Sequence, residues 1–232
     1  MNLFESRNIK MAFDDGGSSF ESLRIIDCNF DNCGLSLSKR PESMSVVRDV
    51  LVSNCNVMNS EVGPTVFEDV VVDDLGVNPI LLFWSCFFCR FVFSGKIGKI
   101  KINVEPSAFC KEGAVLAKFA EMRSKFYEQT DWALDISRAK FVDFSCKGVP
   151  LNLVRRDGET QVVLRREGFP GLDALGAGFD KTFPETYTRL SIFEESRADE
   201  VLLVIPLAAP KKRRDDWAGG VAELRKLHLV KD

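Results

Sequence analysis

The chain has 232 residues, of which 45% are hydrophobic and 28% are charged, and its net charge is −3. This composition predicts a folded globular protein with a core of its own, and the negative charge disfavours a surface that mainly binds nucleic acid. The longest apolar runs, near PILLFW and VLLVIPLAA, fall well short of the roughly 18 residues that a membrane-spanning helix needs. We therefore expect no membrane segment.

The N-terminal stretch MNLFESRNIKMAF carries charges from Glu5 onward and lacks the apolar core of a secretory signal peptide. The seven cysteines are an odd number at irregular spacing. Without an export signal, the simplest interpretation is that these thiols are reduced. The sequence therefore predicts a cytoplasmic protein.

A faint internal repeat marks the first third of the chain. Residues 47–57 (VRDVLVSNCNV) and 67–77 (FEDVVVDDLGV) are offset by 20 positions and are identical at four of eleven. Residues 22–30 fit the same frame 27 positions upstream of 49–57, so that Cys28 aligns with Cys55. Each segment is a short β-branched run, a polar pair and a further apolar residue, which indicates a strand, a corner and the start of another strand.

A short repeat that consists of brief strands is typical of a β-solenoid, in which stacked coils bury an apolar face that a single coil cannot bury. This interpretation predicts that Val50 and Val70 occupy neighbouring positions on adjacent parallel strands. A β-sandwich or roll is the alternative, because alternating valines are common in any β protein.

Cys86 and Cys89 form a Cys-x-x-Cys pair, a spacing found in many zinc and redox sites. If inward positions recur every five residues, both side chains point into the core, where cysteine behaves as a small apolar residue. A zinc ion would need two further ligands, yet there is no second Cys-x-x-Cys pair and His228 is the only histidine. We predict that both cysteines are buried and bind no metal.

Residues 105–130 give the strongest helix prediction. Four apolar residues recur at helical spacing: Val115, Phe119, Met122 and Phe126. Glu121 and Lys125 add a favourable pair one turn apart on another face. We expect this helix to pack on the solenoid as a flank or a cap, since an uncovered coil end exposes strand edges. A partner-binding helix is the alternative.

The five-residue spacing is clearest in residues 134–153. Four apolar positions are five apart: Ile136, Phe141, Cys146 and Leu151. The residues two positions before each of them are apolar too. A helix repeats at 3.6 residues and a strand at 2, so a spacing of five indicates two inward residues on each short side, followed by a corner.

The unit Ala139-Lys140-Phe141-Val142-Asp143 resembles the pentapeptide-repeat family, whose units run Ala-Asp/Asn-Leu-x-x. The resemblance covers about 20 residues well. It implies a right-handed quadrilateral β-helix, and some members of that family bind DNA-processing enzymes through an acidic surface. Trp84 and Phe144 are too large for positions that the family fills with small residues, so we expect a less regular right-handed parallel β-helix.

Residues 151–166 read as a hairpin around Asp157-Gly158, a strong turn signal. Such a hairpin would bring four arginines together: Arg155, Arg156, Arg165 and Arg166. A cluster of this kind can hold a phosphate or an acidic partner. Asp157, Glu159 and Glu167 lie among them, so a surface that neutralises itself is the alternative.

In the remaining chain we expect a loop at 168–185, a buried strand at 200–207, a linker-like turn at 206–216 and a helix at 217–229. The turn carries the densest basic run, Lys211, Lys212, Arg213 and Arg214. Together with Arg155 and Arg156, this run is the candidate partner contact. Asp215 and Asp216 follow at once, so a solvated linker is the alternative.

These elements predict a mainly β fold: a right-handed parallel β-helix with one amphipathic flanking or capping helix and a mixed C-terminal region. Solenoid coils are expected over residues 1–104, the amphipathic helix over 105–130, and a further coil and the hairpin over 131–167. Residues 168–232 should form a loop, a strand and a C-terminal helix packed on the same domain.

No catalytic, cofactor-binding or metal-binding residue is predicted. Ser-His-Asp and Cys-His mechanisms need a base beside the nucleophile, and His228 is the only histidine. Paired carboxylates such as Asp73-Asp74 serve pectin hydrolases, which are β-helical, but the Gly-His-Gly of that family is missing here. We expect Asp73 and Asp74 to be corner residues equivalent to Ser53 and Asn54.

The expected function is therefore that of a non-enzymatic protein-interaction β-solenoid. Its partner would be an unidentified macromolecule, namely a protein rather than a nucleic acid or a membrane. The alternative is a small carbohydrate-active enzyme or a carbohydrate-binding β-helix that uses surface carboxylates.

Overall fold

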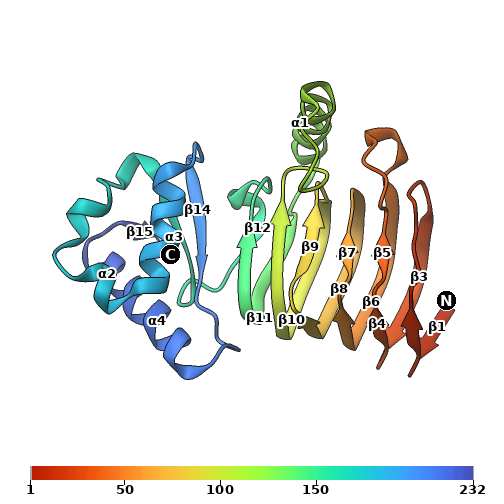
Figure 1. The fold of residues 1–232 in the computed structure, drawn as a ribbon, viewed down its shortest axis with the longest axis horizontal. Helices are drawn as coiled ribbons and strands as arrows, with labels where there is room; N and C mark the ends of the chain where they lie inside the picture. Colours follow the sequence, from red (N-terminus) through yellow and green to blue (C-terminus); the bar gives the residue numbers. More distant parts are fainter. Residues whose placement is uncertain (1, 232) are drawn as a thin grey trace.

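The computed structural model describes residues 2–231, and its main feature is a large curled sheet of parallel strands (Figure 1). The sheet contains β1 (Asn2–Glu5), β2 (Asn8–Lys10), β3 (Ser19–Ile26), β4 (Asn29–Asp31), β5 (Gly34–Leu35), β6 (Ser45–Met58), β7 (Glu61–Val62), β8 (Thr65–Asn78), β9 (Leu81–Trp84), β10 (Phe87–Asn103), β11 (Leu134–Cys146) and β12 (Val154–Arg155). The N-terminus lies at one end of this sheet, and a smaller C-terminal unit lies at the other end.

The strands stack in parallel at the offset that the repeat predicted. Val50 on β6 lies opposite Val70 on β8, as expected, and Phe91 on β10 lies opposite Val70 from the other side. Further along β10, Ile100 lies opposite Leu81 on β9, so the chain returns beside the strand that immediately precedes β10 in the sequence. The sheet is an open half-barrel with a solenoid-like curl. We call each passage of the chain around it a coil.

The bends between short strands are made by residues in the left-handed backbone conformation. They recur every five residues, for example at Asp49, Asn54 and Asn59 and again at Asp69 and Asp74. Most of these residues are Asn, Asp or Ser, the non-glycine types that adopt positive φ most readily or form local turns. The bends of the N-terminal coils therefore recur with the same five-residue spacing that the apolar residues of 134–153 showed in the sequence.

Replacing one such bend residue tests this account. Asn54 has φ +52°, and its amide donates to Asp27 Oδ1 at 2.5 Å. Both Asn54→Val and Asn54→Gly lose that bond, but only valine adds the steric cost of a left-handed β-branched residue. The valine variant should be less stable than the glycine variant by about 1 kcal/mol in denaturant unfolding. Equal stabilities would contradict the role assigned to the bends.

Helix α1 (Gly113–Glu128) flanks the sheet instead of covering an end (Figure 1). It begins eight residues later than predicted (113 − 105); Pro106 disfavours helical backbone at the residue before it. Its predicted apolar face does point toward the sheet: the Phe126 ring lies 5.4 Å from that of Phe87. On the same side, Tyr127 Oη accepts from the backbone of Phe88 at 3.4 Å.

The C-terminal unit is a three-stranded antiparallel sheet covered by helices. Its strands are β13 (Gln161–Arg165), β14 (Glu200–Val204) and β15 (Val230–Lys231), in the order β14-β13-β15. Its helices are α2 (Phe179–Thr182), α3 (Pro184–Glu195) and α4 (Lys211–Lys226). Short 3-10 turns, η1 (Pro41–Ser43), η2 (Leu151–Leu153), η3 (Arg166–Gly168) and η4 (Leu172–Leu175), occur between the main elements.

This small sheet closes one end of the solenoid-like core. Its two faces are both apolar: Val163, Leu202 and Val204 belong to the large core, whereas Leu164 and Leu203 pack beneath the helices. The contact is also polar, because Ala208 N donates to Phe141 O at 3.0 Å and Gln161 Nε2 donates to Ile136 O at 2.8 Å. The unit therefore caps the C-terminal end of the coils.

The predicted hairpin at 151–166 is wrong. A turn does form at Asp157, whose carbonyl accepts from Gln161 N at 2.9 Å. However, β12 pairs in parallel with β11, whereas β13 pairs antiparallel with β14 and β15. The turn joins two sheets because β13 is apolar on both faces: Val163 faces the large core, and Val162 and Leu164 face the helices. A strand beside β12 at the edge of the large sheet would leave one of these faces uncovered.

Two further predictions for the C-terminal region are wrong. The expected linker at 206–216 is partly helical, because α4 begins at Lys211, six residues before the predicted start (217 − 211). Residues 168–185 were expected to be a loop, yet they include α2 and the start of α3 at Pro184, a residue suited to the first helical turn. A side chain at Gly220 would meet Thr186 at 2.4 Å, so this glycine permits the close approach of α3 and α4.

Candidate functional site

The basic run at the start of α4 does not form one free patch. Arg213 joins α4 to the large sheet: it pairs with Glu185, lies 3.3 Å from Asp143 and donates to Val142 O at 3.1 Å. Lys211 and Lys212 are exposed, and Arg214 is half-buried. Arg213 therefore serves the cap, and the candidate contact among these residues reduces to the exposed lysines.

The predicted arginine cluster is not formed, because the hairpin that would assemble it is missing. The Arg155 guanidinium stacks on the Trp132 ring at 4.0 Å, and Arg156 donates to Gln161 O at 3.2 Å. Beyond the turn, Arg166 donates to three carbonyl groups at the C-terminal end of α3 and just after it, those of Phe193, Ser196 and Ala198. Each of these arginines is committed to its own neighbours.

Asp73 and Asp74 hold one coil against the next, as expected of corner residues. Asp73 Oδ1 accepts from Ser94 Oγ at 2.5 Å, and Asp74 Oδ1 accepts from the backbone of Lys96 at 2.6 Å. Asp73 lies opposite Ser53 on the neighbouring strand, and Asp74 has φ +49°. These contacts give both carboxylates a structural role.

The burial predicted for the Cys-x-x-Cys pair is confirmed for Cys86 and wrong for Cys89. Cys86 is buried, and burial raises the pKa of its thiol. Cys89 is half-buried, because it lies beside the bend at Arg90, whose guanidinium donates to Cys89 Sγ at 3.1 Å. Over residues 2–231 no group of three or more His, Cys, Asp or Glu side chains is arranged to hold a metal ion.

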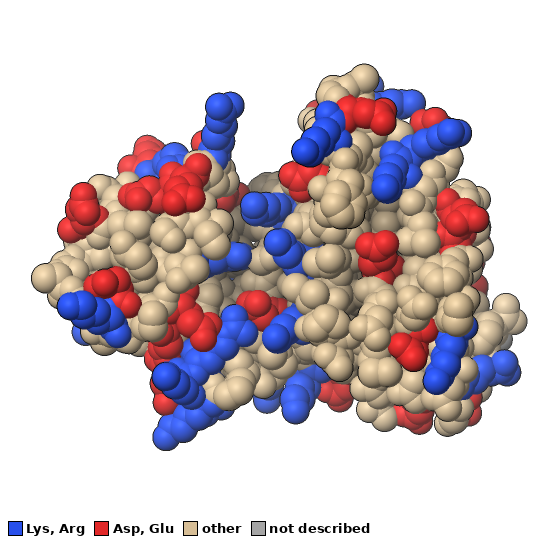
Figure 2. Space-filling model, in the orientation of Figure 1, with Lys and Arg blue, Asp and Glu red and all other residues tan. Residues whose placement is uncertain are grey.

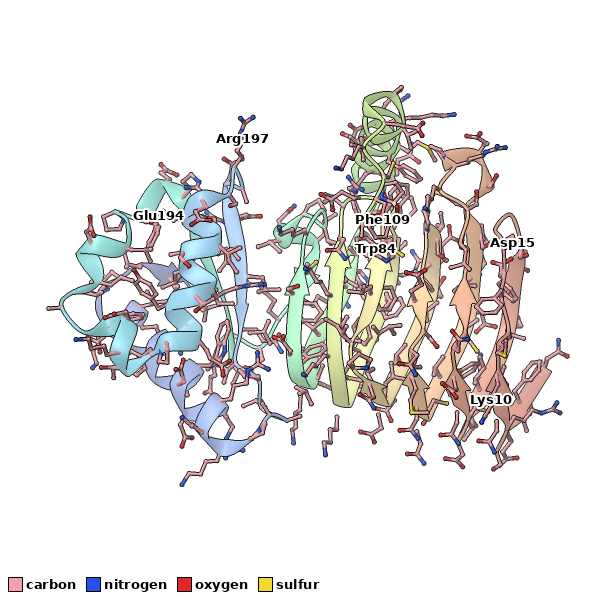
Figure 3. The ribbon with its side chains drawn as sticks, in the orientation of Figure 1. Lys10, Asp15, Trp84, Phe109, Glu194 and Arg197 are labelled. Carbon is pink, nitrogen blue, oxygen red and sulfur yellow. The ribbon has the colours of Figure 1, made fainter. Side chains whose placement is uncertain are left out.

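The N-terminal end of the curled sheet differs from the capped end. Among the described residues, β1 pairs only with β3 and β2 only with β4, so the outer backbone groups of both strands face away from the sheet. Three large apolar residues of this first coil, Leu3, Met11 and Phe13, are between 54% and 69% exposed. In Figure 3 the labelled Lys10 and Asp15 mark this end.

The inner side chains show that the core is open at the same end. One inward column runs through successive strands from Leu23 to Val50, Val70 and Phe91. Leu23 is only half-buried, whereas the exposed fraction is 4% at Val50, 2% at Val70 and 1% at Phe91. Burial thus increases from the first strands toward the middle of the sheet.

Asp14 fixes the rim of this opening to the second coil. Its carboxylate accepts from Ser18 Oγ and Ser45 Oγ, both at 2.6 Å, and from the backbone of Ser36 at 3.0 Å. Burial alone would raise the pKa of this carboxyl, but the hydrogen bonds hold it below its ordinary value. These hydrogen bonds hold the rim in a fixed position against the second coil, and Asp14 is charged at neutral pH.

The rim carries charges of both signs. Glu5 and Asp15 are exposed acids, and Arg7 and Lys10 are exposed bases. Arg7 lies 5.4 Å from the centre of the Phe4 ring, and Lys10 is 4.0 Å from Asp31. Figure 2 likewise shows both signs interspersed over the visible face of the coils.

The open end was not predicted from the sequence, although Leu3, Met11 and Phe13 were a usable signal: they are large apolar residues in a stretch that is also rich in charge.

Comparison with protein-family models, characterised proteins and solved structures finds no match to this chain. Among the helices of residues 2–231, none combines the length and apolar character needed to cross a bilayer.

Proposed function

We propose that this protein is a non-enzymatic protein-interaction β-solenoid and that its N-terminal end is the interface. One observation carries the proposal: the C-terminal end of the core is covered by β13 and β14, whereas the first coil leaves strand edges and apolar side chains uncovered. The carbohydrate alternative has less support, because the carboxylates of Asp73 and Asp74 are committed to neighbouring coils.

We also infer that the coils form a right-handed parallel β-helix distantly similar to the pentapeptide-repeat family. The support is the left-handed bend every five residues, together with the stacking of Val50 on Val70 at the same position of successive coils. The seven free cysteines fit a protein of the reducing cytoplasm, which is the location that we propose.

The unpaired strands favour a partner that supplies another strand edge. An uncovered β-edge offers a row of backbone donors and acceptors, and soluble proteins usually block such edges with charges, prolines or bulges. The first coil has exposed charges but no proline between Asn2 and Ser18, and its exposed side chains also include Leu3 and Phe13. Strand addition would pair the backbone while the partner covers the apolar residues.

The partner that we propose is a second copy of this chain, joined end to end. Two-fold dimers use the same patch on both copies, so the patch must complement itself. The mixed rim meets this condition, because a two-fold axis across the opening can set the basic stretch around Arg7 and Lys10 of one copy against Asp15 of the other.

Light scattering on the full chain tests the dimer. The wild type should have twice the 26.0 kDa mass of one chain. The double variant Leu3→Lys, Phe13→Lys should be a monomer, because burying two charges at the interface is costly. The matched control is Phe109→Lys, which changes an exposed phenylalanine beside α1, far from the rim (Figure 3); this variant should remain a dimer.

Circular dichroism would establish that the double variant is folded before its mass is interpreted. A wild type that is a monomer at all accessible concentrations would overturn the proposed partner. A dimer that survives the double variant would place the interface elsewhere on the molecule.

A further inference from the structure

The interior of the curled sheet contains an apolar cavity at its N-terminal end. The inward column from Leu23 to Val50 and Val70 continues to Phe91, and the next column, from Ile25 to Val52 and Val72, reaches Phe93. Both columns therefore change from aliphatic residues to phenylalanine at the same coil. The smaller side chains leave space that the phenylalanines fill further along.

Phenylalanine rings close the inner end of this space. Phe67, Phe83, Phe91 and Phe93 line the cavity, and they contact one another, with ring centres 5.3 Å apart for Phe67 and Phe91 and 4.8 Å apart for Phe91 and Phe93. At the other end the lining includes Phe13, which is more than half exposed. Phe13 therefore marks a mouth that opens at the N-terminal rim.

The cavity has a volume of about 430 Å³. Ligand pockets commonly range from roughly 300 to 1,000 Å³, and a dry apolar cavity of about 150 Å³ binds benzene. By that measure the space suits a molecule of roughly 15–20 non-hydrogen atoms. Its lining extends over four neighbouring strands, β3, β6, β8 and β10, which favours an elongated shape.

The lining specifies the chemistry of the occupant. Nearly all lining residues are apolar, and three polar members, Asp14, Ser60 and Glu61, are already bonded to the protein. Asp14 accepts from serines, Ser60 Oγ donates to Met58 O at 2.7 Å, and Glu61 Oε2 accepts from Trp84 Nε1 at 3.1 Å. A charged group inside would be desolvated without compensation, so the buried part of a ligand must be neutral and apolar.

We propose that this cavity is a binding site for an elongated neutral apolar small molecule, such as a medium-length hydrocarbon chain, that enters at the N-terminal rim. The site does not depend on the dimer proposed above, because the residues that line its depth belong to one chain. A second copy at the rim would enclose the ligand but would not form its walls.

The test uses N-phenyl-1-naphthylamine, a neutral apolar dye that fluoresces on entering an apolar site, and lauryl alcohol as its competitor. The wild type should bind the dye and release it to lauryl alcohol. Val50→Phe places an aromatic ring in the cavity and should weaken dye binding about tenfold or more, which corresponds to at least about 1.4 kcal/mol of binding free energy.

Leu51→Phe is the matched control, since Leu51 neighbours Val50 on β6 but points to the opposite side of the strand and does not line the cavity. It should bind the dye like the wild type. If Val50→Phe does not fold, Val70→Phe fills the same space from the next strand.

A wild type that does not bind the dye, or a folded Val50→Phe variant that binds it as well as Leu51→Phe does, would overturn the site. Light scattering on the same samples separates this result from the dimer proposal, since loss of dye binding in a protein of unchanged mass concerns the cavity alone.

Discussion

Replacing Phe91 with alanine should lower the free energy of unfolding by about 3–5 kcal/mol. Phe91 is buried, and its ring is surrounded by three others at centre-to-centre distances of 4.8 Å (Phe93), 5.3 Å (Phe67) and 5.3 Å (Phe88). Truncation removes these aromatic contacts and leaves a void next to the existing cavity. Neighbouring coils cannot close around the void without breaking the parallel register that Val70 and Leu134 share with Phe91.

The matched control is Val92→Ala. Val92 follows Phe91 on β10, is half-buried and faces the opposite side of the strand. Its truncation should cost less than about 1 kcal/mol, as is usual near the surface. Unfolding of both variants in denaturant gives the comparison. Similar losses for Phe91 and Val92 would mean that the inward column does not carry the stability of the coils.

The stacking of the coils could be predicted from the sequence because it depends on a regular spacing. Val50 and Val70 occupy the same position in the two aligned segments, and parallel coils bring such positions together. The same reasoning gave the corner role of Asp74. It was wrong for Cys89, because the inward residues lie one and three positions after each bend. After the bend at Ser85 these are Cys86 and Phe88, so Cys89 points elsewhere.

The cap could not be predicted in the same way. Val163 on β13 pairs with Leu202 on β14, which lies beyond α2 and α3 in the sequence, and no repeat connects the two strands. The nearby turn at Asp157 favoured a local hairpin, but the burial of β13 on both faces is satisfied only by distant partners. Local signals identified the strand and not its neighbours.

The candidate site was missed for a related reason. A run of four basic residues suggests a surface patch, yet Arg213 on α4 finds its partner Asp143 on β11, a strand of the other sheet. The open end exists because no described element packs over Leu3 and Phe13. This can be known only once the whole fold is known. The cavity behind it depends on comparing inward residues, such as Val50 and Phe91, once their register is known.

The difference between the two ends has a consequence for stability. A solenoid core is only as well shielded from water as its terminal coils. At the C-terminal end, Leu202 and Val204 of the cap extend the core by one more layer and belong to the same cluster as Phe141 and Leu134. Exposing this end would leave the protein with two uncovered ends.

Replacing Leu202 with aspartate should therefore loosen the cap and lower the free energy of unfolding by about 4–5 kcal/mol or more. Leu202 is buried between the small sheet and the last coil, opposite Val163. A carboxylate at this position is desolvated without a partner, so either its pKa rises or the cap separates. A separated cap would expose the edge of the last coil and promote aggregation.

The pH dependence of this variant has a defined sign. Burial raises the folded-state pKa of the new carboxyl above its unfolded value, so the folded state binds the proton more tightly. The loss in the free energy of unfolding relative to wild type should be smallest below the unfolded pKa and should grow as pH rises through the folded pKa.

Glu200→Ala is the control on the same strand. The carboxylate of Glu200 lies 3.8 Å from Arg165 at the surface, and its loss should lower the free energy of unfolding by less than about 1 kcal/mol. Denaturant unfolding at several pH values, with hydrogen exchange at β13 and β14, measures both effects. A deficit for Leu202→Asp that matches that of Glu200→Ala would show that β14 does not seal the core. A large deficit that does not change with pH would show that the cap has separated and left the new carboxylate in water.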